Sequence, residues 1–387
     1  MARRLLVAPA LLAMLVALCG ATPELTPAQR ASILAKPASV SAKEHVTRIP
    51  LEGTDHRGFY RCPYMRVNIN GQGPFTFLFD TGSPCTIVTS KVIKAARLPV
   101  TVDRGGYHDL VRIKEMKVSG VTIKDVVAVR DDDYGVDGVF GFKVFGDMNV
   151  VFELQSRQLL VSPEPVPLPG SFELIYELPH NIPVIPVIVG ADQVATLIDT
   201  GDDAYAWEVR TEDLKGATLA HPPSPAEQVL NGANASQTAV STLESMVHVG
   251  PLTIEHAVVG INDALPVPDF GVDYLKDFNI EFNPKLMTVA FQPLSASAGT
   301  KISGNLGVGF TLHFDDKGTV QNVVPGSAAE QRGMHSGDKI LSVNGRPIHG
   351  VNPRTWDAAL ATGKPLAVRW LEGTKERTDD FEVKEQR

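Results

Sequence analysis

The chain has 387 residues, enough for two to four domains at roughly 100–200 residues each. Apolar residues make up 43% and charged residues 21%, which is typical of globular domains and excludes a disordered, collagenous or multi-span membrane chain. Lys and Arg number 36 against 44 Asp and Glu, so the net charge is −8 and no nucleic-acid partner is expected. The 28 Pro and 33 Gly, with only 7% aromatic residues, favour many short strands joined by turns.

The N-terminus has the pattern of an export signal. Two arginines come first, an apolar stretch follows at residues 5–18, and small residues end the segment at 19–21. This apolar stretch is too short to span a bilayer. We therefore predict that residues 1–21 are a signal peptide, and that the mature protein is exported, either periplasmic or secreted, without a membrane span. Residues 22–50 are expected to form an N-terminal tether or a removable propeptide, between which the sequence does not distinguish.

The three cysteines also bear on export and on the compartment in which the protein resides. Cys19 lies in the signal segment and allows a lipid-anchored form, but the bulky Leu18 before it fits that processing poorly, so simple removal is favoured. Cys62 and Cys85 remain in the mature chain, where an oxidising compartment would let them form a disulfide. Three cysteines are too few for a four-thiolate zinc site. No metal and no cofactor are expected.

The chain repeats itself. Residues 77–83 read FLFDTGS and residues 196–202 read TLIDTGD, so two apolar strands each end in Asp-Thr-Gly. Downstream, Val-Phe-Gly at 139–141 matches Asp-Phe-Gly at 269–271, and two further apolar strands follow each triplet. The second repeat is longer, and its extra residues fall in a Pro-, Ser- and Asn-rich stretch at 221–237 that we expect to be an inserted loop.

These paired motifs resemble the aspartic proteases, both the two-lobed pepsin type and the dimeric retroviral type. The resemblance covers about residues 60–165 and 180–294. It implies a single-chain pseudo-dimer of two β-barrel lobes with one active site between them. We place the first lobe at residues 51–165 and the second at 172–294.

The resemblance implies that Asp80 and Asp199 form the catalytic dyad for hydrolysis of polypeptide substrates. Two carboxylates held close together share one proton. The ionised member takes a proton from water while the protonated member polarises the scissile carbonyl. The threonines of the two loops are expected to brace the loops, the glycines to allow sharp turns, and Ser83 to donate its hydroxyl to Asp80. The residues expected to support the loops are Thr81, Gly82, Ser83, Thr200, Gly201 and Asp202.

Asp202 departs from the family pattern, which places Ser or Thr there. An ionised carboxylate accepts hydrogen bonds but cannot donate one, and its charge is expected to raise proton affinity across the site. Either activity persists to a higher pH, or the protein is a catalytically inactive peptide-binding relative. Because both Asp-Thr-Gly triplets are intact, we favour retained activity. Asp269 in the second apolar-apolar-Gly element is a further departure.

A flap over the cleft is also part of the family architecture. Gly105, Gly106 and Tyr107 stand between the first catalytic loop and the next strand, where a flap hairpin belongs. An ordinary hairpin turn with a surface tyrosine explains these residues equally well.

Residues 303–387 resemble a PDZ domain and follow a Ser- and Ala-rich linker at 295–304. In that family an extended peptide lies beside a strand, here 310–314, and extends the sheet by main-chain hydrogen bonds. We expect the module to bind peptide C-termini of substrates or to dock the catalytic lobes. The alternative is a glycine loop that only turns the chain. The residues expected to hold the terminal carboxylate are Gly307, Val308, Gly309 and Phe310.

Other chemistries lack their motifs. The sequence contains neither Gly-x-Ser-x-Gly nor His-Glu-x-x-His, which argues against serine and zinc hydrolases. The acidic run at 131–133 is expected to be a solvated turn, with calcium binding as a minor alternative. The sequence therefore predicts an exported aspartic endopeptidase of mainly β fold, in which a two-lobed β-barrel pseudo-dimer precedes a PDZ domain.

Overall fold

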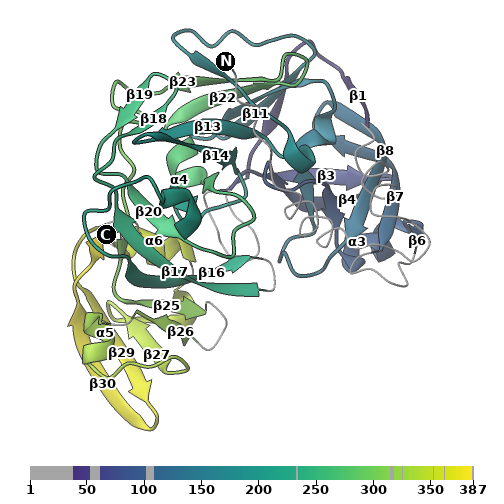
Figure 1. Ribbon diagram of the computed structural model, residues 1–387. Coiled ribbons are helices and arrows are strands. Elements are labelled where there is room, and N and C mark those ends of the chain that lie inside the picture. The colour runs from purple at the N-terminus through teal and green to yellow at the C-terminus, as the bar shows by residue number, and fades with distance from the viewer. Residues whose placement is uncertain are drawn as a thin grey trace.

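The computed structural model describes residues 38–52, 62–101, 109–231, 234–304, 306–313, 318–324, 326–351, 353–360 and 362–385. Within them the chain is mainly β, and its strands form two lobes and a smaller C-terminal unit (Figure 1). The two-lobed, mainly β fold expected from the sequence is confirmed. No helix within these ranges is long and apolar enough to cross a bilayer.

The first lobe is a closed six-stranded barrel. It closes because β8 pairs with both β5 and β7, and the strands run around the ring in the order β8-β5-β9-β4-β3-β7. The pairs β4–β9 and β5–β8 are parallel. Apolar and polar residues alternate along β3 and β7, so one face of each strand is buried in the barrel. The elements are β1 (Ser39–Ala42), β3 (Tyr64–Ile69), β4 (Gln72–Asp80), β5 (Thr86–Val88), α3 (Ser90–Ala96), β6 (Val100–Thr101), β7 (Leu110–Val118), β8 (Val121–Arg130), β9 (Gly138–Gly141) and η1 (Phe142–Phe145).

The second lobe repeats this strand order as β20-β15-β21-β14-β13-β18. The pairs β14–β21 and β15–β20 are again parallel. The ring stays open, because β18 pairs with β19 and β20 pairs with β17. The elements are η2 (Pro179–Asn181), β13 (Val184–Val189), β14 (Asp192–Ile198), β15 (Glu208–Val209), η3 (Thr211–Leu214), β16 (Ser224–Asn231), β17 (Asn234–Thr242), β18 (Val247–Val249), β19 (Leu252–Ile254), β20 (Val258–Ile261), β21 (Asp269–Phe270) and α4 (Val272–Leu275).

The stretch at 221–237 was expected to be an inserted loop, and this expectation is wrong. Strands β16 and β17 pair there as an antiparallel hairpin. The proline at position 225 stands beside a register shift in β16, the kind of irregularity that lets a strand accommodate proline. The Pro-, Ser- and Asn-rich composition of this stretch, which is typical of loops, therefore did not reveal the hairpin.

A third sheet joins the lobes. Its central strands, β10 from the first lobe and β22 from the second, pair antiparallel, with Val150 opposite Phe282. The rings of Phe152 and Phe282 meet edge to face with centroids 6.0 Å apart, so the sheet and the core beneath it are shared by the two lobes. The strands are β12 (Phe172–Ile175), β23 (Thr288–Pro293), β22 (Phe278–Asn283), β10 (Asn149–Glu153), β11 (Gln158–Ser162) and β2 (Thr47–Pro50).

The C-terminal unit has its own sheet, in the order β25-β26-β27-β29-β30, and its own core. Rings of Phe310, Trp356, Trp370 and Phe381 contact one another in that core. Strand β26 lies beside β16 of the second lobe (Figure 1). The elements are β24 (Leu306–Gly307), β25 (Phe310–His313), β26 (Thr319–Val323), α5 (Ala328–Gln331), β27 (Lys339–Val343), β28 (Arg346–Pro347), η4 (Ile348–Gly350), α6 (Pro353–Leu360), β29 (Leu366–Glu372), β30 (Lys375–Phe381) and β31 (Lys384–Glu385).

Candidate active site

The two Asp-Thr-Gly loops lie against each other between the lobes. Asp80 ends β4, and Asp199 directly follows β14. A Cβ atom added to Gly82 would collide with the Asp199 carboxylate, and one added to Gly201 would stand 2.5 Å from Cγ of Asp80. Each glycine thus leaves the space that the aspartate of the opposite loop occupies, and the two carboxylates lie close together.

Thr81 and Thr200 link the loops through four hydrogen bonds. Each threonine hydroxyl accepts the main-chain N–H of the other, at 3.1 Å for the Thr81 N–H and 2.9 Å for the Thr200 N–H. Each hydroxyl also donates across the interface, Thr81 to the Ile198 carbonyl at 2.5 Å and Thr200 to the Phe79 carbonyl at 2.7 Å. Both threonines are fully buried, so these bonds form without competition from water.

The environment of the dyad favours a retained proton. Burial, reinforced by the charge of Asp199, raises the pKa of Asp80 well above its ordinary value. Burial also raises the pKa of Asp199, but hydrogen bonds from the Gly201 N–H and from the Asp80 side chain act in the opposite direction. Two buried carboxylates this close therefore share one proton, which titrates as a property of the pair.

Ser83 differs from its expected role. Its main-chain N–H donates to Asp80 Oδ1 at 2.9 Å, whereas its hydroxyl donates to the Cys85 carbonyl at 2.8 Å. The tight turn after Asp80 thus presents a backbone donor to the carboxylate and turns the hydroxyl away from it. On the second loop Gly201, two residues after Asp199, donates its N–H to Asp199 Oδ1 at 2.7 Å.

Cys62 and Cys85 are buried in one apolar cluster, but no disulfide joins them. The Cys62 Sγ points to the Gly201 carbonyl, 3.5 Å away, so this structure does not contain the disulfide that the sequence suggested. Burial and the charge of Asp203 raise the pKa of the Cys62 thiol, which keeps it in the unreactive protonated form.

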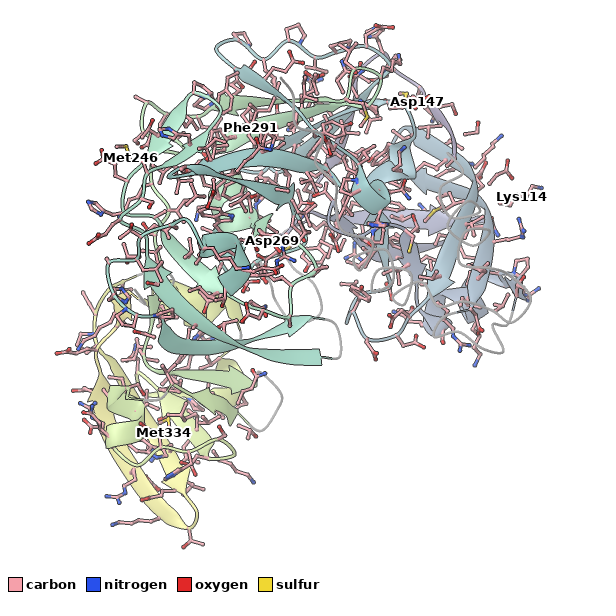
Figure 2. All side chains as sticks on the ribbon, viewed as in Figure 1. Lys114, Asp147, Met246, Asp269, Phe291 and Met334 are labelled. Carbon is pink, nitrogen blue, oxygen red and sulfur yellow. The ribbon has the colours of Figure 1, made fainter. Side chains whose placement is uncertain are left out.

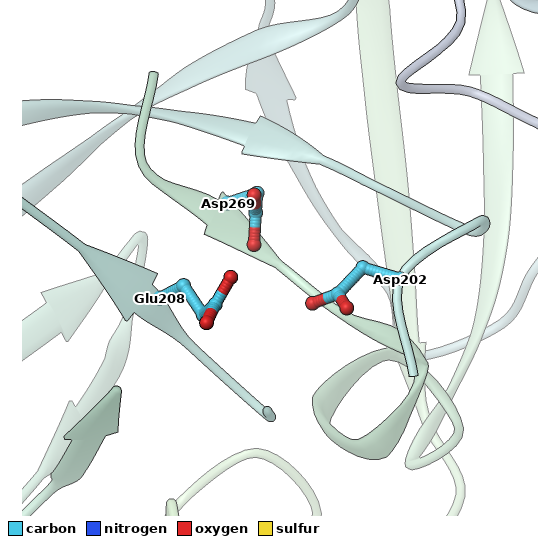
Figure 3. Close-up of side chains that lie close together, drawn as sticks. All are labelled: Asp202, Glu208 and Asp269. Atoms are coloured by element: carbon cyan, nitrogen blue, oxygen red, sulfur yellow. The ribbon is translucent and has the colours of Figure 1, made fainter. Parts of the chain in front are cut away.

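Behind the second loop, three carboxylates converge. Oxygen atoms of Asp202, Glu208 and Asp269 lie within 4.8 Å of one another (Figure 3). Burial is the largest cause of the raised pKa of all three groups, and it raises that of Glu208 to about 7. Figure 2 places Asp269 in the interior of the second lobe. Sequence reasoning identified the two aspartates as departures and missed Glu208, although a glutamate in the apolar run 204–209 was a visible signal.

The expected flap residues Gly105, Gly106 and Tyr107 lie outside the described residues. Strands β6 and β7, which flank them in the chain, pair antiparallel. On the β8–β9 connection, Tyr134 lies near the dyad: burial, and then the charge of Asp80, raise its pKa. No sequence motif marked this tyrosine.

The acidic run at 131–133 is a turn beside α3. Asp132 accepts hydrogen bonds from the N–H and the hydroxyl of Ser90, at 2.7 and 2.6 Å, at the start of the helix. An acidic side chain there also interacts favourably with the helix dipole. Asp131 Oδ1 accepts the N–H of Asp133 at 3.0 Å.

In the C-terminal unit, β25 stands at one end of the sheet order. Gly309 has a φ of 86°, and a Cβ there would stand 2.6 Å from Cβ of Ser327, so the loop before β25 requires glycine. Val308 and Phe310 are buried in the core, and Gly307 pairs with Lys384. The ring of Phe310 contacts Trp356 of α6, with centroids 5.7 Å apart, so the edge strand and this helix are packed together.

Comparison with known families agrees with this geometry. Residues 65–144 match a family model described as aspartyl protease, and residues 289–367 match a family model described as PDZ domain. No curated protein gives a significant match to the chain. The first match covers β3 to β9 and the loop that carries Asp80. The chain therefore contains an aspartyl protease domain followed by a C-terminal PDZ domain.

Proposed function

We propose that this protein is an aspartic endopeptidase whose single active site uses Asp80 and Asp199. One observation carries the proposal: the two aspartates come from equivalent loops of two repeated lobes, and each lies against the glycine of the other loop. The threonine hydrogen bonds between the loops fix this approach. Such a symmetric carboxylate pair, buried and sharing one proton, is suited to water activation.

In the proposed mechanism Asp199 acts as the base and Asp80 as the acid. The ionised Asp199 accepts a proton from the attacking water, and the protonated Asp80 donates a hydrogen bond to the scissile carbonyl. These roles are part of the proposal, since both carboxylates accept main-chain N–H hydrogen bonds, Asp80 from Ser83 at 2.9 Å and Asp199 from Gly201 at 2.7 Å. The proton then moves to the departing amine, which restores a pair with one proton.

The PDZ domain is proposed to bind peptide C-termini along β25. This strand stands at the end of its sheet and is backed by α6, the arrangement that β-augmentation requires. Since β26 lies beside β16 of the second lobe, a bound chain would be held near the catalytic lobes. We also propose that the protein is exported after removal of residues 1–21, which N-terminal sequencing of the secreted or periplasmic form would test.

The catalytic proposal is tested with purified protein and an unfolded polypeptide substrate between about pH 3 and 8, the range over which a carboxylate pair titrates. Asp80→Asn and Asp199→Asn are expected to abolish cleavage, because each removes the shared-proton chemistry while keeping the shape of the side chain. Asp133→Asn, at an exposed carboxylate in the 131–133 turn, is the matched control and should cleave like the parent. Cleavage that survives in both dyad variants, or a folded parent without cleavage, would reject the proposal in favour of a non-catalytic peptide-binding protein.

A further inference from the structure

The second lobe has carboxylates where the first lobe has two apolar residues and a serine. In the first barrel, Ile87 of β5 pairs with Val139 of β9. At the equivalent place in the second lobe, Glu208 of β15 pairs with Asp269 of β21. Asp202 likewise replaces the serine that stands three residues after the first catalytic aspartate. Three replacements by one chemical type, at positions that meet in space, indicate a built site.

The three side chains point toward one another from different elements (Figure 3). Glu208 is 1% exposed and Asp269 is 5% exposed. One carboxylate oxygen of each residue is buried without any hydrogen-bond partner, namely Asp202 Oδ2, Glu208 Oε1 and Asp269 Oδ1. Unpartnered buried oxygens are costly, and the three residues that carry them lie together, with a carboxylate oxygen of each within 4.8 Å of the others.

The surrounding backbone leaves room for the carboxylates. A Cβ on Gly271 would stand 2.6 Å from Asp202 Oδ2, and one on Gly260 would stand 3.2 Å from Cγ of Glu208. No lysine or arginine in the described ranges forms an ion pair with any of the three. Buried carboxylates in contact therefore need either protons or a bound cation.

We propose that Asp202, Glu208 and Asp269 bind one divalent cation, and that calcium is the preferred ion. The donor set is all oxygen, which selects hard cations over zinc or copper. Calcium accepts about 6–8 oxygen ligands in flexible geometry, whereas magnesium demands a near-ideal octahedron and gives up its water reluctantly. Three largely buried carboxylates from separate elements, with oxygens within 4.8 Å of one another, therefore suit calcium better. Asp202 is partly exposed, whereas Glu208 and Asp269 are buried.

The cation site lies three residues from Asp199 along the same loop. A bound ion would neutralise Asp202, whose charge otherwise opposes ionisation of Asp199, and would tie the loop to β15 and β21. The aspartic protease pattern places a Ser or Thr hydroxyl at the position of Asp202. In this protein the bound ion takes the place of that hydroxyl and holds the loop that carries Asp199. Cation binding is measured directly by calorimetry, so its test does not depend on peptidase activity.

The test is titration calorimetry of the metal-stripped full chain with calcium chloride and, separately, magnesium chloride, together with thermal unfolding in each salt. We expect one calcium site per chain, weaker magnesium binding and a calcium-dependent rise in the unfolding temperature of the lobes. Glu208→Gln keeps the shape of the side chain and is expected to weaken calcium binding by at least about tenfold. The triple change Asp202→Ser, Glu208→Ile and Asp269→Val, which installs the residues of the first lobe, should abolish it.

Asp133→Asn is the control for the acidic run at 131–133 and should bind calcium like the parent. Three results would overturn the proposal. The first is a folded parent that binds neither ion up to about 10 mM, beyond the weakest extracellular calcium sites. The second is magnesium binding as tight as calcium binding, and the third is calcium binding that survives Glu208→Gln but is lost in Asp133→Asn. The first result would assign the carboxylates to shared protons.

Discussion

Thr200→Val isolates the contribution of the hydrogen bonds that hold the two Asp-Thr-Gly loops together. Valine keeps the size of the side chain but removes the hydroxyl, which donates to the Phe79 carbonyl at 2.7 Å and accepts the Thr81 N–H at 3.1 Å. Thr81 and Thr200 are fully buried, so water cannot replace either bond. A buried group left without its partner costs about 1–3 kcal/mol. With two groups left without partners, we expect the lobes to lose about 2–6 kcal/mol of unfolding free energy.

Differential scanning calorimetry of the full chain measures this loss. For a domain of this size, 1 kcal/mol corresponds to about 2–4 °C, so the transition of the lobes should fall by roughly 10 °C. The PDZ domain has its own core, and its transition should stay in place as an internal reference. Thr288→Val is the matched control, because Thr288 Oγ1 is buried without a partner and its loss should be neutral or slightly stabilising. Equal effects of the two substitutions would refute the reasoning.

Three further predictions follow from the same structure. Burial raises the pKa of Glu208 from 4.5 to about 7, so in metal-free protein the folded state binds more protons than the unfolded state between these values. Stability should therefore fall by up to about 3 kcal/mol as the pH rises through this window, and urea midpoints should show a flatter dependence for Glu208→Gln. Gly82→Ala places a methyl group against the Asp199 carboxylate and should lower peptide cleavage by about 10²-fold; a parent-like rate would contradict this placement. Gly309→Ala, at a φ of 86° and with its Cβ 2.6 Å from Cβ of Ser327, should destabilise the PDZ domain by about 1–3 kcal/mol, and an unchanged PDZ transition in calorimetry would argue against it.

The residues of the dyad and the strands that carry them were predictable from the chain alone. Asp-Thr-Gly after an apolar strand is a local pattern, and its repetition at Asp80 and Asp199 predicts two equivalent lobes. The alternation of apolar and polar residues marked strands such as β7, because side chains point to opposite faces along a strand. Local propensity failed at 221–237, where a hairpin forms in spite of a composition typical of loops.

Side-chain directions were not predictable. The Ser83 hydroxyl donates to the Cys85 carbonyl, and the Ser83 N–H donates to Asp80. The geometry of one turn determines both directions. The Cys62 thiol faces Gly201 of the other lobe, so two cysteines near each other in sequence do not pair in the structure. The Ser83 contacts are set within one turn, whereas the Cys62 contact depends on a neighbour from a distant part of the chain.

The sequence by itself determined the chemistry available at the site, namely two aspartate carboxylates on glycine turns, with Asp202 as the departure. Only the tertiary structure decided that Asp202 shares its surroundings with Glu208 and Asp269. These residues meet because β21 pairs with both β14 and β15, and such pairings join segments far apart in the chain. Local patterns specify which residues form strands, whereas the order and register of the strands specify which side chains meet.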